Sequence, residues 1–412
     1  MNRISSRAKK IAWLLTLVYF ASYLMRINFA TMIVKICSDM SVEKSALAIV
    51  VTGLTITYGG GQIVSGFLGD KFKPQNILTV GLFLAAICNV AMYFCSAIPI
   101  MTAVWCVNGF AHSMLWPPIV RLMSMYLSDE EYGYSAVRVS WGSSFATILL
   151  YVVCPLLLYI MSWRTVMLIC AAGGAAIGLV WTLGNKKLLS MPVESKSGEK
   201  KNDGESARVP LPKFVFFPIA LIMIGIILQG VLRDGVQNWM PSYLLESFGM
   251  SEENAIFATV ILAIFSIVSF AVFDFIHRKL FKNEVFCAAM IFAFATLSAL
   301  ALYFCNLVFD VAAVSMILMA FISAGMHGIN LMLITVVPKR FVKSGKVSTF
   351  SGILNACTYI GASLSTYGFA VMAENFGWNV TIFMWAVVAA CGLGVCLLAS
   401  PLWKKFRRTY SD

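Results

Sequence analysis

Twelve long apolar runs dominate this 412-residue sequence and limit what it can fold into. A transmembrane helix needs about 20 apolar residues, whereas the strands of a membrane β-barrel are short and alternate in polarity. Hydrophobic residues make up 60% of the chain and charged residues only 12%, which excludes a water-facing exterior. The sequence therefore predicts an all-α membrane protein with twelve transmembrane helices. The runs fall at about 11–34, 45–68, 75–94, 99–127, 134–159, 164–184, 214–244, 254–276, 283–305, 309–337, 348–372 and 378–402.

One polar stretch divides the runs into six and six. Residues 185–213 are rich in Lys, Glu, Ser and Gly, as a solvated linker is. The predicted domains are an N-terminal bundle over 1–184, a cytoplasmic linker over 185–213 and a C-terminal bundle over 214–412. Arg26 and Arg233 occupy equivalent positions in the two halves, which indicates a duplicated six-helix unit. Paired repeats of this kind are typical of alternating-access transporters.

The basic residues indicate how the helices are oriented. The net charge is +12, but the Lys and Arg residues lie between apolar runs rather than on one amphipathic face, so no nucleic-acid partner is expected. With the amino terminus in the cytoplasm, 24 basic residues fall inside and only Lys35, Lys44 and Arg164 fall outside. The positive-inside rule then predicts a multi-pass protein of the cell membrane with both termini in the cytoplasm.

Motifs for covalent or metal chemistry are absent from the sequence. The eleven cysteines sit mostly inside apolar runs, where a thiol packs as a small hydrophobic group. There is no phosphate-binding loop, no zinc spacing and no evident pair of nucleophile and base. We therefore expect no enzymatic activity, no catalytic residue, no cofactor and no metal. A monomer with a small anion and the lipid bilayer as its partners is expected.

Two arginines deep inside apolar runs are the first functional candidates. Arg26 lies about fifteen residues into the first run and Arg233 equally deep in the seventh, where a charge costs at least a few kcal/mol unless it faces a partner or a cavity. Asp234 is the one acid clearly inside a run, and its side chain leaves the helix about 100° from that of Arg233. One acid cannot neutralise two arginines, so the pair predicts an anion site. Planar guanidinium groups suit phosphate or carboxylate.

Other polar and aromatic residues in the runs are weaker candidates. His112 and His327 occupy equivalent helices, where an imidazole either contacts substrate, relays a proton or simply bonds a neighbouring carbonyl. Arg121 and Arg138 lie near cytoplasmic helix ends and are interpreted as structural. Further residues that could line a cavity are Tyr23, Tyr58, Trp116, Trp239, Asn330 and Tyr359.

Several short segments resemble one transporter family. The segment Arg233-Asp234-Gly235-Val236-Gln237-Asn238-Trp239-Met240-Pro241-Ser242-Tyr243-Leu244 is similar to helix 7 of the organophosphate:inorganic phosphate antiporters. These belong to the major facilitator superfamily and include glycerol-3-phosphate and hexose-6-phosphate transporters. Further similar segments are Gly66-Phe67-Leu68-Gly69-Asp70-Lys71, Trp116-Pro117-Pro118 with Arg121, Met161-Ser162-Trp163-Arg164 and Val337-Pro338-Lys339-Arg340.

The resemblance implies a phosphate group clamped between Arg26 and Arg233. Asn238, in the segment that begins at Arg233, is a further candidate for substrate binding. Two positions depart from the family pattern. Gln62 stands where the family carries a lysine in helix 2, and the helix 5 histidine of the glycerol-3-phosphate members falls on Ser143 or a neighbour. A clamp with one positive charge fewer favours a less charged anion, such as a phosphodiester or a carboxylate.

Together these features predict a secondary active transporter of small organic anions. The expected mechanism is alternating access, with an organophosphate exchanged for inorganic phosphate. Two alternatives remain open at this stage. One is a proton-coupled organic anion symporter, and the other is a transporter-like sensor that binds hexose phosphate and signals to a membrane kinase.

Overall fold

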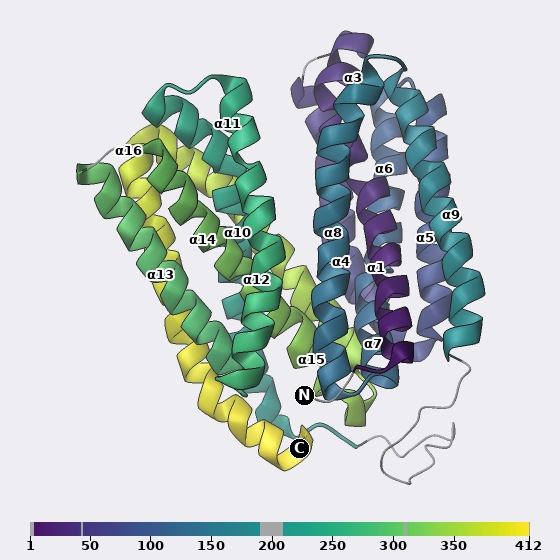
Figure 1. Cartoon of the computed structure of the whole chain (residues 1–412), viewed down its shortest axis with the longest axis vertical. Helices are drawn as coiled ribbons and strands as arrows, with labels where there is room; N and C mark the ends of the chain where they lie inside the picture. The colour runs from purple at the N-terminus through teal and green to yellow at the C-terminus, as the bar shows by residue number, and fades with distance from the viewer. Residues whose placement is uncertain (1–3, 43, 190–208, 309–310, 412) are drawn as a thin grey trace. The chain divides into compact units, whose positions relative to one another are not determined.

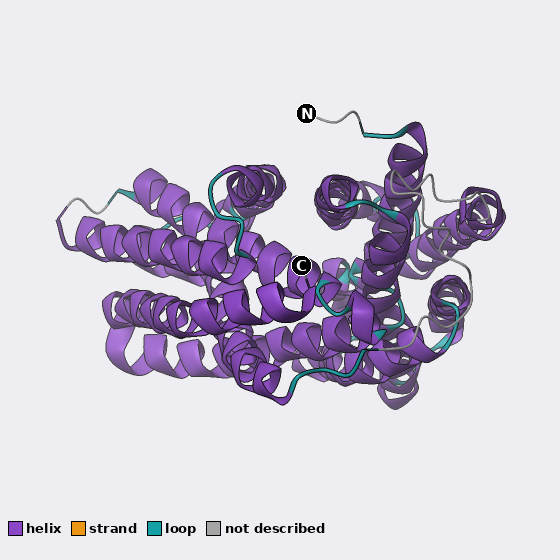
Figure 2. Ribbon diagram, turned by 90° about the horizontal axis from the view of Figure 1, so that it is seen from below, coloured by secondary structure: helices purple, strands orange, loops and turns teal. Residues whose placement is uncertain are grey.

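The computed structural model describes residues 4–42, 44–189, 209–308 and 311–411. All regular structure in these ranges is helical, without a β-strand, as Figure 2 shows. Most of the predicted linker, residues 190–208, lies outside the described residues. The chain forms two compact units (Figure 1). The first unit is Met1–Leu211 with Phe341–Ile353, and the second unit is Pro212–Arg340 with Leu354–Asp412.

The first unit is built around the packing of its first helix. Helix α1 packs against α8 and α9, while α4 packs against α6, and α5 against α6 and α9 (Figure 1). Its helices are α1 (Ser6–Arg26), α2 (Asn28–Thr31), α3 (Ile33–Met40), α4 (Lys44–Lys71), α5 (Pro74–Phe94), α6 (Ile98–Ser113), α7 (Trp116–Tyr126), α8 (Asp129–Leu158) and α9 (Trp163–Leu189).

The second unit is built around α14, which packs against α10, α12 and α13. Its elements are η1 (Lys213–Val215), α10 (Phe216–Phe248), α11 (Glu252–Ala258), α12 (Val260–Lys279), α13 (Glu284–Val308), α14 (Ala312–Asn330), η2 (Leu331–Val336), α15 (Val337–Lys339) and η4 (Arg407–Ser411). Helix α16 (Val347–Phe406) begins in the first unit and continues in the second, and η3 (Val342–Ser344) precedes it.

Ten helices of the described residues are long and apolar enough to cross a membrane. The last of them, α16, contains two of the predicted runs. They meet at a kink at Gly377, whose φ of 76° lies in the left-handed region that favours glycine. Helix α1 is not among the ten, since basic residues occupy its first turns and a break follows Arg26. With α1 to α3 as the first crossing and α16 as the last two, the described helices make up the twelve predicted crossings.

Several runs that the sequence predicts as continuous helices are interrupted in the structure, among them the run over 254–276, which changes from α11 to α12, and the run over 309–337, which contains η2. The first run, predicted over 11–34, changes from α1 to α2 at Ile27. The fourth run, predicted over 99–127, is interrupted between α6 and α7. The break in the fourth run has a simple cause, because Pro117 and Pro118 open α7 and lack the backbone N–H groups that a continuous helix would need.

A carboxylate holds the start of α16 within the first unit. Asp70 accepts hydrogen bonds from the backbone N–H groups of Ser348 at 2.9 Å and Thr349 at 2.7 Å. These N–H groups belong to the first turn of α16, where a helix offers them no backbone acceptor of its own. Arg121 supports this cap, since its Nε lies 3.7 Å from Asp70 Oδ1 and its Nη1 donates to the carbonyl of Gly69. Arg121 therefore has the structural role that its position near a helix end suggests.

A buried carboxylate plays a comparable part in the second unit. Glu284, in the first turn of α13, is fully buried and contacts two arginines. Its Oε1 lies 2.9 Å from Nε of Arg340, and its Oε2 lies 2.9 Å from Nη1 of Arg407. A buried carboxylate without a cationic partner is energetically costly. Arg407 must therefore stay beside Glu284, which holds the C-terminal turns of the chain against α13.

Candidate functional site

The break after Arg26 arises from asparagine side chains that replace a helical hydrogen bond. The carbonyl of Met25 accepts from Nδ2 of Asn89 at 2.9 Å and from Nδ2 of Asn108 at 3.1 Å. The N–H of Phe29, which would bond Met25 in a continuous helix, donates instead to Oδ1 of Asn28 at 2.9 Å. The helix can therefore end at Arg26 without leaving these buried backbone groups unpaired.

The three asparagines come from three different elements and are all fully buried. Nδ2 of Asn28 donates to Oδ1 of Asn89 at 2.7 Å, so the side chains form one connected network. Sequence reasoning did not single them out, although polar residues inside apolar runs are a signal that could have found them. Their pairing joins positions about sixty to eighty residues apart, which no local pattern indicates.

Arg26 is the last residue of α1 and packs against two aromatic rings. Its Cζ lies 4.1 Å from the ring centroid of Tyr23 and 4.6 Å from that of Tyr58. Ring faces attract a guanidinium without neutralising it, and the C-terminal end of a helix is favourable for a cation. Arg26, Tyr23 and Tyr58, three of the predicted site residues, are thus brought together.

His112 and Trp116 lie on either side of the break between α6 and α7. Nδ1 of His112 is 3.1 Å from Oγ of Ser22, one turn before Arg26 on α1, and the imidazole interacts electrostatically with that arginine. Tyr19 links Trp116 to Tyr23, since its ring centroid lies 4.9 Å from that of Trp116 and 5.2 Å from that of Tyr23. The first unit therefore gathers five of the predicted residues around the end of α1.

Gln62 and Ser143 occupy the positions that depart from the family pattern. Gln62 follows Tyr58 by one turn on the same face of α4, is fully buried, and has no hydrogen-bond partner for either amide atom within the described ranges. Ser143 is partly exposed on α8, where its Oγ donates to the carbonyl of Ser140 at 2.7 Å. Buried polar atoms normally have a hydrogen-bond partner, so the amide of Gln62 is the better candidate of the two for contact with a ligand.

The second unit places Arg233 within an ion pair. Its Nε lies 2.6 Å from Oδ1 of Asp234, and both side chains are largely buried. Helix geometry alone directs the two side chains about 100° apart. That angle describes where the side chains leave the helix, but the long, flexible arginine side chain folds back far enough to reach its neighbour.

His327 on α14 interacts electrostatically with Arg233 and Asp234, and its ring lies 5.5 Å from that of Phe270. Gln229, one turn before Arg233, donates from Nε2 to the carbonyl of Met326 at 3.0 Å. In both units, a polar side chain one turn before the arginine therefore connects its helix to the helix that carries the histidine.

The remaining candidates of the second unit lie at its irregular segments or on its surface. Asn330 ends α14 and is followed by the π-helical stretch η2, a type of irregularity that is frequent at functional sites. Asn238 is exposed on α10, about 140° around the helix from Arg233. Among the described residues, no group of three or more His, Cys, Asp or Glu side chains could hold a metal ion.

The long apolar helices in two units define a multi-pass membrane protein, and comparison with known sequences identifies its family. Residues 15–366 match the sequence profile of the Major Facilitator Superfamily. The chain belongs to this superfamily and is a secondary transporter, not an enzyme. A solved structure of the proton:xylose symporter XylE, bound to 6-bromo-6-deoxy-D-glucose, has a TM-score of 0.73 and 13% sequence identity, and the match covers 98% of this chain and 96% of that chain. This likeness shows the fold.

Relatives of known name extend the comparison. The glycerol-3-phosphate transporter of Bacillus subtilis is 25% identical, over 92% of this chain and 89% of the relative. The membrane sensor protein UhpC of Escherichia coli is 22% identical, over 92% of this chain and 89% of that protein. The chain is therefore similar along nearly its whole length to proteins of the organophosphate transporter group.

The asparagine network makes a prediction about stability. Asn89→Ala removes the partner of Asn28 and one donor to Met25, so it should lower the free energy of unfolding by about 1–3 kcal/mol. Asn375→Ala is the matched control, because Asn375 is exposed and its side-chain amide donates to the carbonyl of Val371 in its own helix. It should change the unfolding free energy by less than about 0.5 kcal/mol. Thermal melting of the purified proteins in detergent measures both, and equal melting temperatures would contradict the role of the network.

Proposed function

We propose that this transporter exchanges small organic anions of the organophosphate class for inorganic phosphate. The observation that carries the proposal is the position of Arg26, at the end of a broken helix and held between two aromatic rings. In transporters, discontinuous helices commonly form the substrate site near the middle of the membrane. A guanidinium there is expensive unless it binds an anion or another partner.

Arg233 is the proposed second substrate-binding residue. Its Nε contacts Asp234, while a guanidinium carries four further N–H donors on its two Nη atoms. Phosphate and carboxylate oxygens match this fork geometry in bidentate fashion. We propose that Arg26 and Arg233 bind the same anion and that His112 and His327 contribute to its recognition. Similarity to the Bacillus subtilis glycerol-3-phosphate transporter supports the substrate class.

The proposed substrate is less charged than the phosphomonoesters of the best-known relatives. Gln62 provides amide groups where the resemblance implies a lysine, and it lies one turn along α4 from Tyr58, which contacts Arg26. An amide hydrogen-bonds an anion without adding charge. A monoanionic phosphodiester or a carboxylate would therefore lose less binding energy at this site than a dianion would.

A sensing role is the second candidate, because one of the relatives is named as a membrane sensor protein. A sensor would bind the same class of anion but need not move it. Uptake of labelled phosphate into proteoliposomes that contain only this protein separates the two functions. Rapid exchange supports transport, whereas saturable binding without exchange supports sensing.

We further propose that both termini are cytoplasmic, on the strength of the charge asymmetry between the two sides. In a cysteine-free background, Lys200→Cys in the predicted linker should react with a membrane-impermeant thiol reagent only from the cytoplasmic side. Glu252→Cys, between two runs of the second half, should react from outside. Labelling of position 200 on intact cells would overturn the orientation.

The arginine pair makes the central prediction. Arg26→Lys and Arg233→Lys keep the charge but lose the planar fork, so each should reduce phosphate exchange in proteoliposomes by about ten- to a hundredfold. Because both residues bind one anion, the double variant should be little worse than either single variant. Arg408→Lys, at an exposed position near the C-terminus, is the control and should retain exchange. Near-normal exchange by Arg26→Lys or Arg233→Lys would refute the proposed site.

Gln62 makes a prediction about substrate preference. Gln62→Lys should shift competition towards dianionic phosphomonoesters over monoanionic phosphodiesters by at least about fivefold, because a nearby cation binds the more highly charged ligand more strongly. Asn375→Lys adds the same charge at an exposed position and should leave the preference unchanged. The measurement is inhibition of labelled phosphate exchange by each ligand. An unaltered competition profile in Gln62→Lys would show that Gln62 does not face the substrate.

A further inference from the structure

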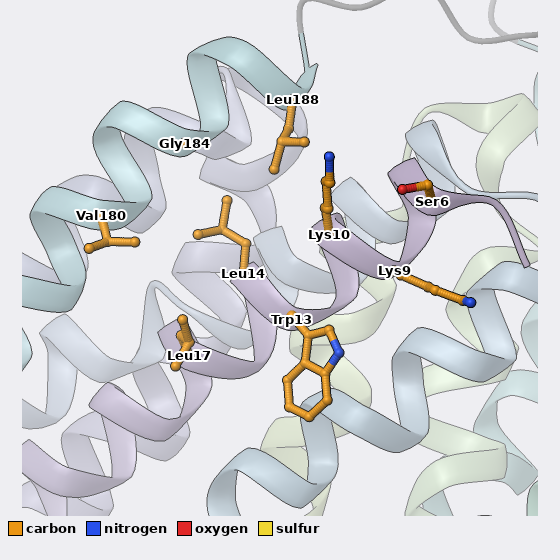
Figure 3. A pocket seen from close by; sticks show the side chains of 9 residues that line it. All are labelled: Ser6, Lys9, Lys10, Trp13, Leu14, Leu17, Val180, Gly184 and Leu188. Carbon is orange, nitrogen blue, oxygen red and sulfur yellow. The ribbon is translucent and has the colours of Figure 1, made fainter.

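A groove of about 400 Å³ lies between α1 and α9 (Figure 3), and none of the candidate anion-binding residues lines it. One face of α1 forms one wall, with Lys10, Leu14 and Leu17 along it. The other wall is a single face of α9, in which Val180, Gly184 and Leu188 follow each other at intervals of one turn. The groove therefore runs along two neighbouring helices and begins at the basic first turns of α1.

Two local features create the groove and fix its basic end. Gly184 has no side chain, and a Cβ atom placed there would lie 3.3 Å from Cδ2 of Leu14, which points towards it in Figure 3. The absent side chain lets Leu14 pack closely against the backbone of α9, so the two helices meet here and form the floor of the groove. At the end of the groove, Nε of Arg7 donates to the carbonyl of Leu188 at 3.3 Å, which ties the C-terminal turn of α9 to the first turn of α1.

The groove is apolar along its length and positively charged at one end. Trp13, Leu17 and Val180 are 51%, 41% and 51% exposed, as expected for side chains that face lipid. Lys9 and Lys10 are exposed in the first turns of α1. Lys10 extends on the side of α9, whereas Lys9 extends to the other side of α1 (Figure 3). Tryptophan and lysine at the end of a membrane helix are typical of the level of the lipid headgroups.

From this arrangement we propose that the groove binds one anionic phospholipid. An acyl chain lies along the apolar walls of Leu14, Leu17 and Val180. The phosphate binds Lys10 at the end of the groove, and Lys9 reaches it by a change of rotamer of its exposed side chain. Basic residues beside an apolar groove between membrane helices are the chemistry that recognises anionic headgroups. A free phosphate would meet only two exposed lysines, and the apolar walls would add nothing to its binding, so the occupant is a lipid.

The test uses the purified full-length protein and native mass spectrometry with phosphatidylglycerol and phosphatidylcholine of the same acyl chains. Wild type should bind one phosphatidylglycerol more tightly than phosphatidylcholine. Lys9→Gln/Lys10→Gln should weaken phosphatidylglycerol binding by about 25-fold, about fivefold for each lysine, and leave phosphatidylcholine binding unchanged. Lys279→Gln/Lys282→Gln removes the same charge from exposed positions of the second unit and should have no effect.

A second variant tests the apolar walls separately from the charge. Gly184→Leu fills the groove and should weaken binding of both lipids, since it occupies the space of the acyl chain. Three results would each overturn the proposal. They are equal binding of the two lipids by wild type, an equal loss in the two double lysine variants, and displacement of the lipid by glycerol phosphate as effective as displacement by intact phosphatidylglycerol.

Discussion

The need to satisfy every backbone polar group away from water governs this structure more than any other constraint. A helix within the membrane can end only where another group accepts or donates the hydrogen bond that the helix loses. Asn28, Asn89 and Asn108 provide these groups at the end of α1, through the bonds to Met25 and Phe29. The position of Arg26 at a helix end, beside Tyr23 and Tyr58, therefore depends on a network of neutral side chains.

Other irregularities in the helices also lie next to candidate functional residues. The interruption between α6 and α7 separates His112 from Trp116 by one loose turn, and the π-helical stretch η2 directly follows Asn330. Such segments lack some of the regular hydrogen bonds of a helix, and the surrounding packing must offset the free energy that this loss costs. Their position beside polar side chains, rather than at random points along the apolar helices, favours a functional origin for them.

The sequence predicted the helices and the two arginines, but it could not predict the local geometry around them. Length and hydropathy determine where a chain crosses a membrane, so the runs correspond closely to the helices. The break after Arg26 depends on contacts between α1, α5 and α6. Arg26 and Asn28 mark the run as polar at this point, but the partner asparagines lie in other runs, which no local pattern connects to it. The pairing of Arg233 with Asp234 was also missed, because helical angles describe Cβ directions and not the reach of a long side chain.

The two arginines differ in their electrostatic surroundings, and this difference bears on the proposed substrate. Tyr23 and Tyr58 contact Arg26 through neutral rings, which attract a guanidinium but carry no formal charge. Asp234 offsets much of the charge of Arg233, because the two groups are in contact and largely buried. In the proposed site, the two arginines and Asp234 would carry about one net positive charge, because Gln62 adds none. A monoanion would balance that charge, whereas a dianion would be under-compensated in a medium of low dielectric constant.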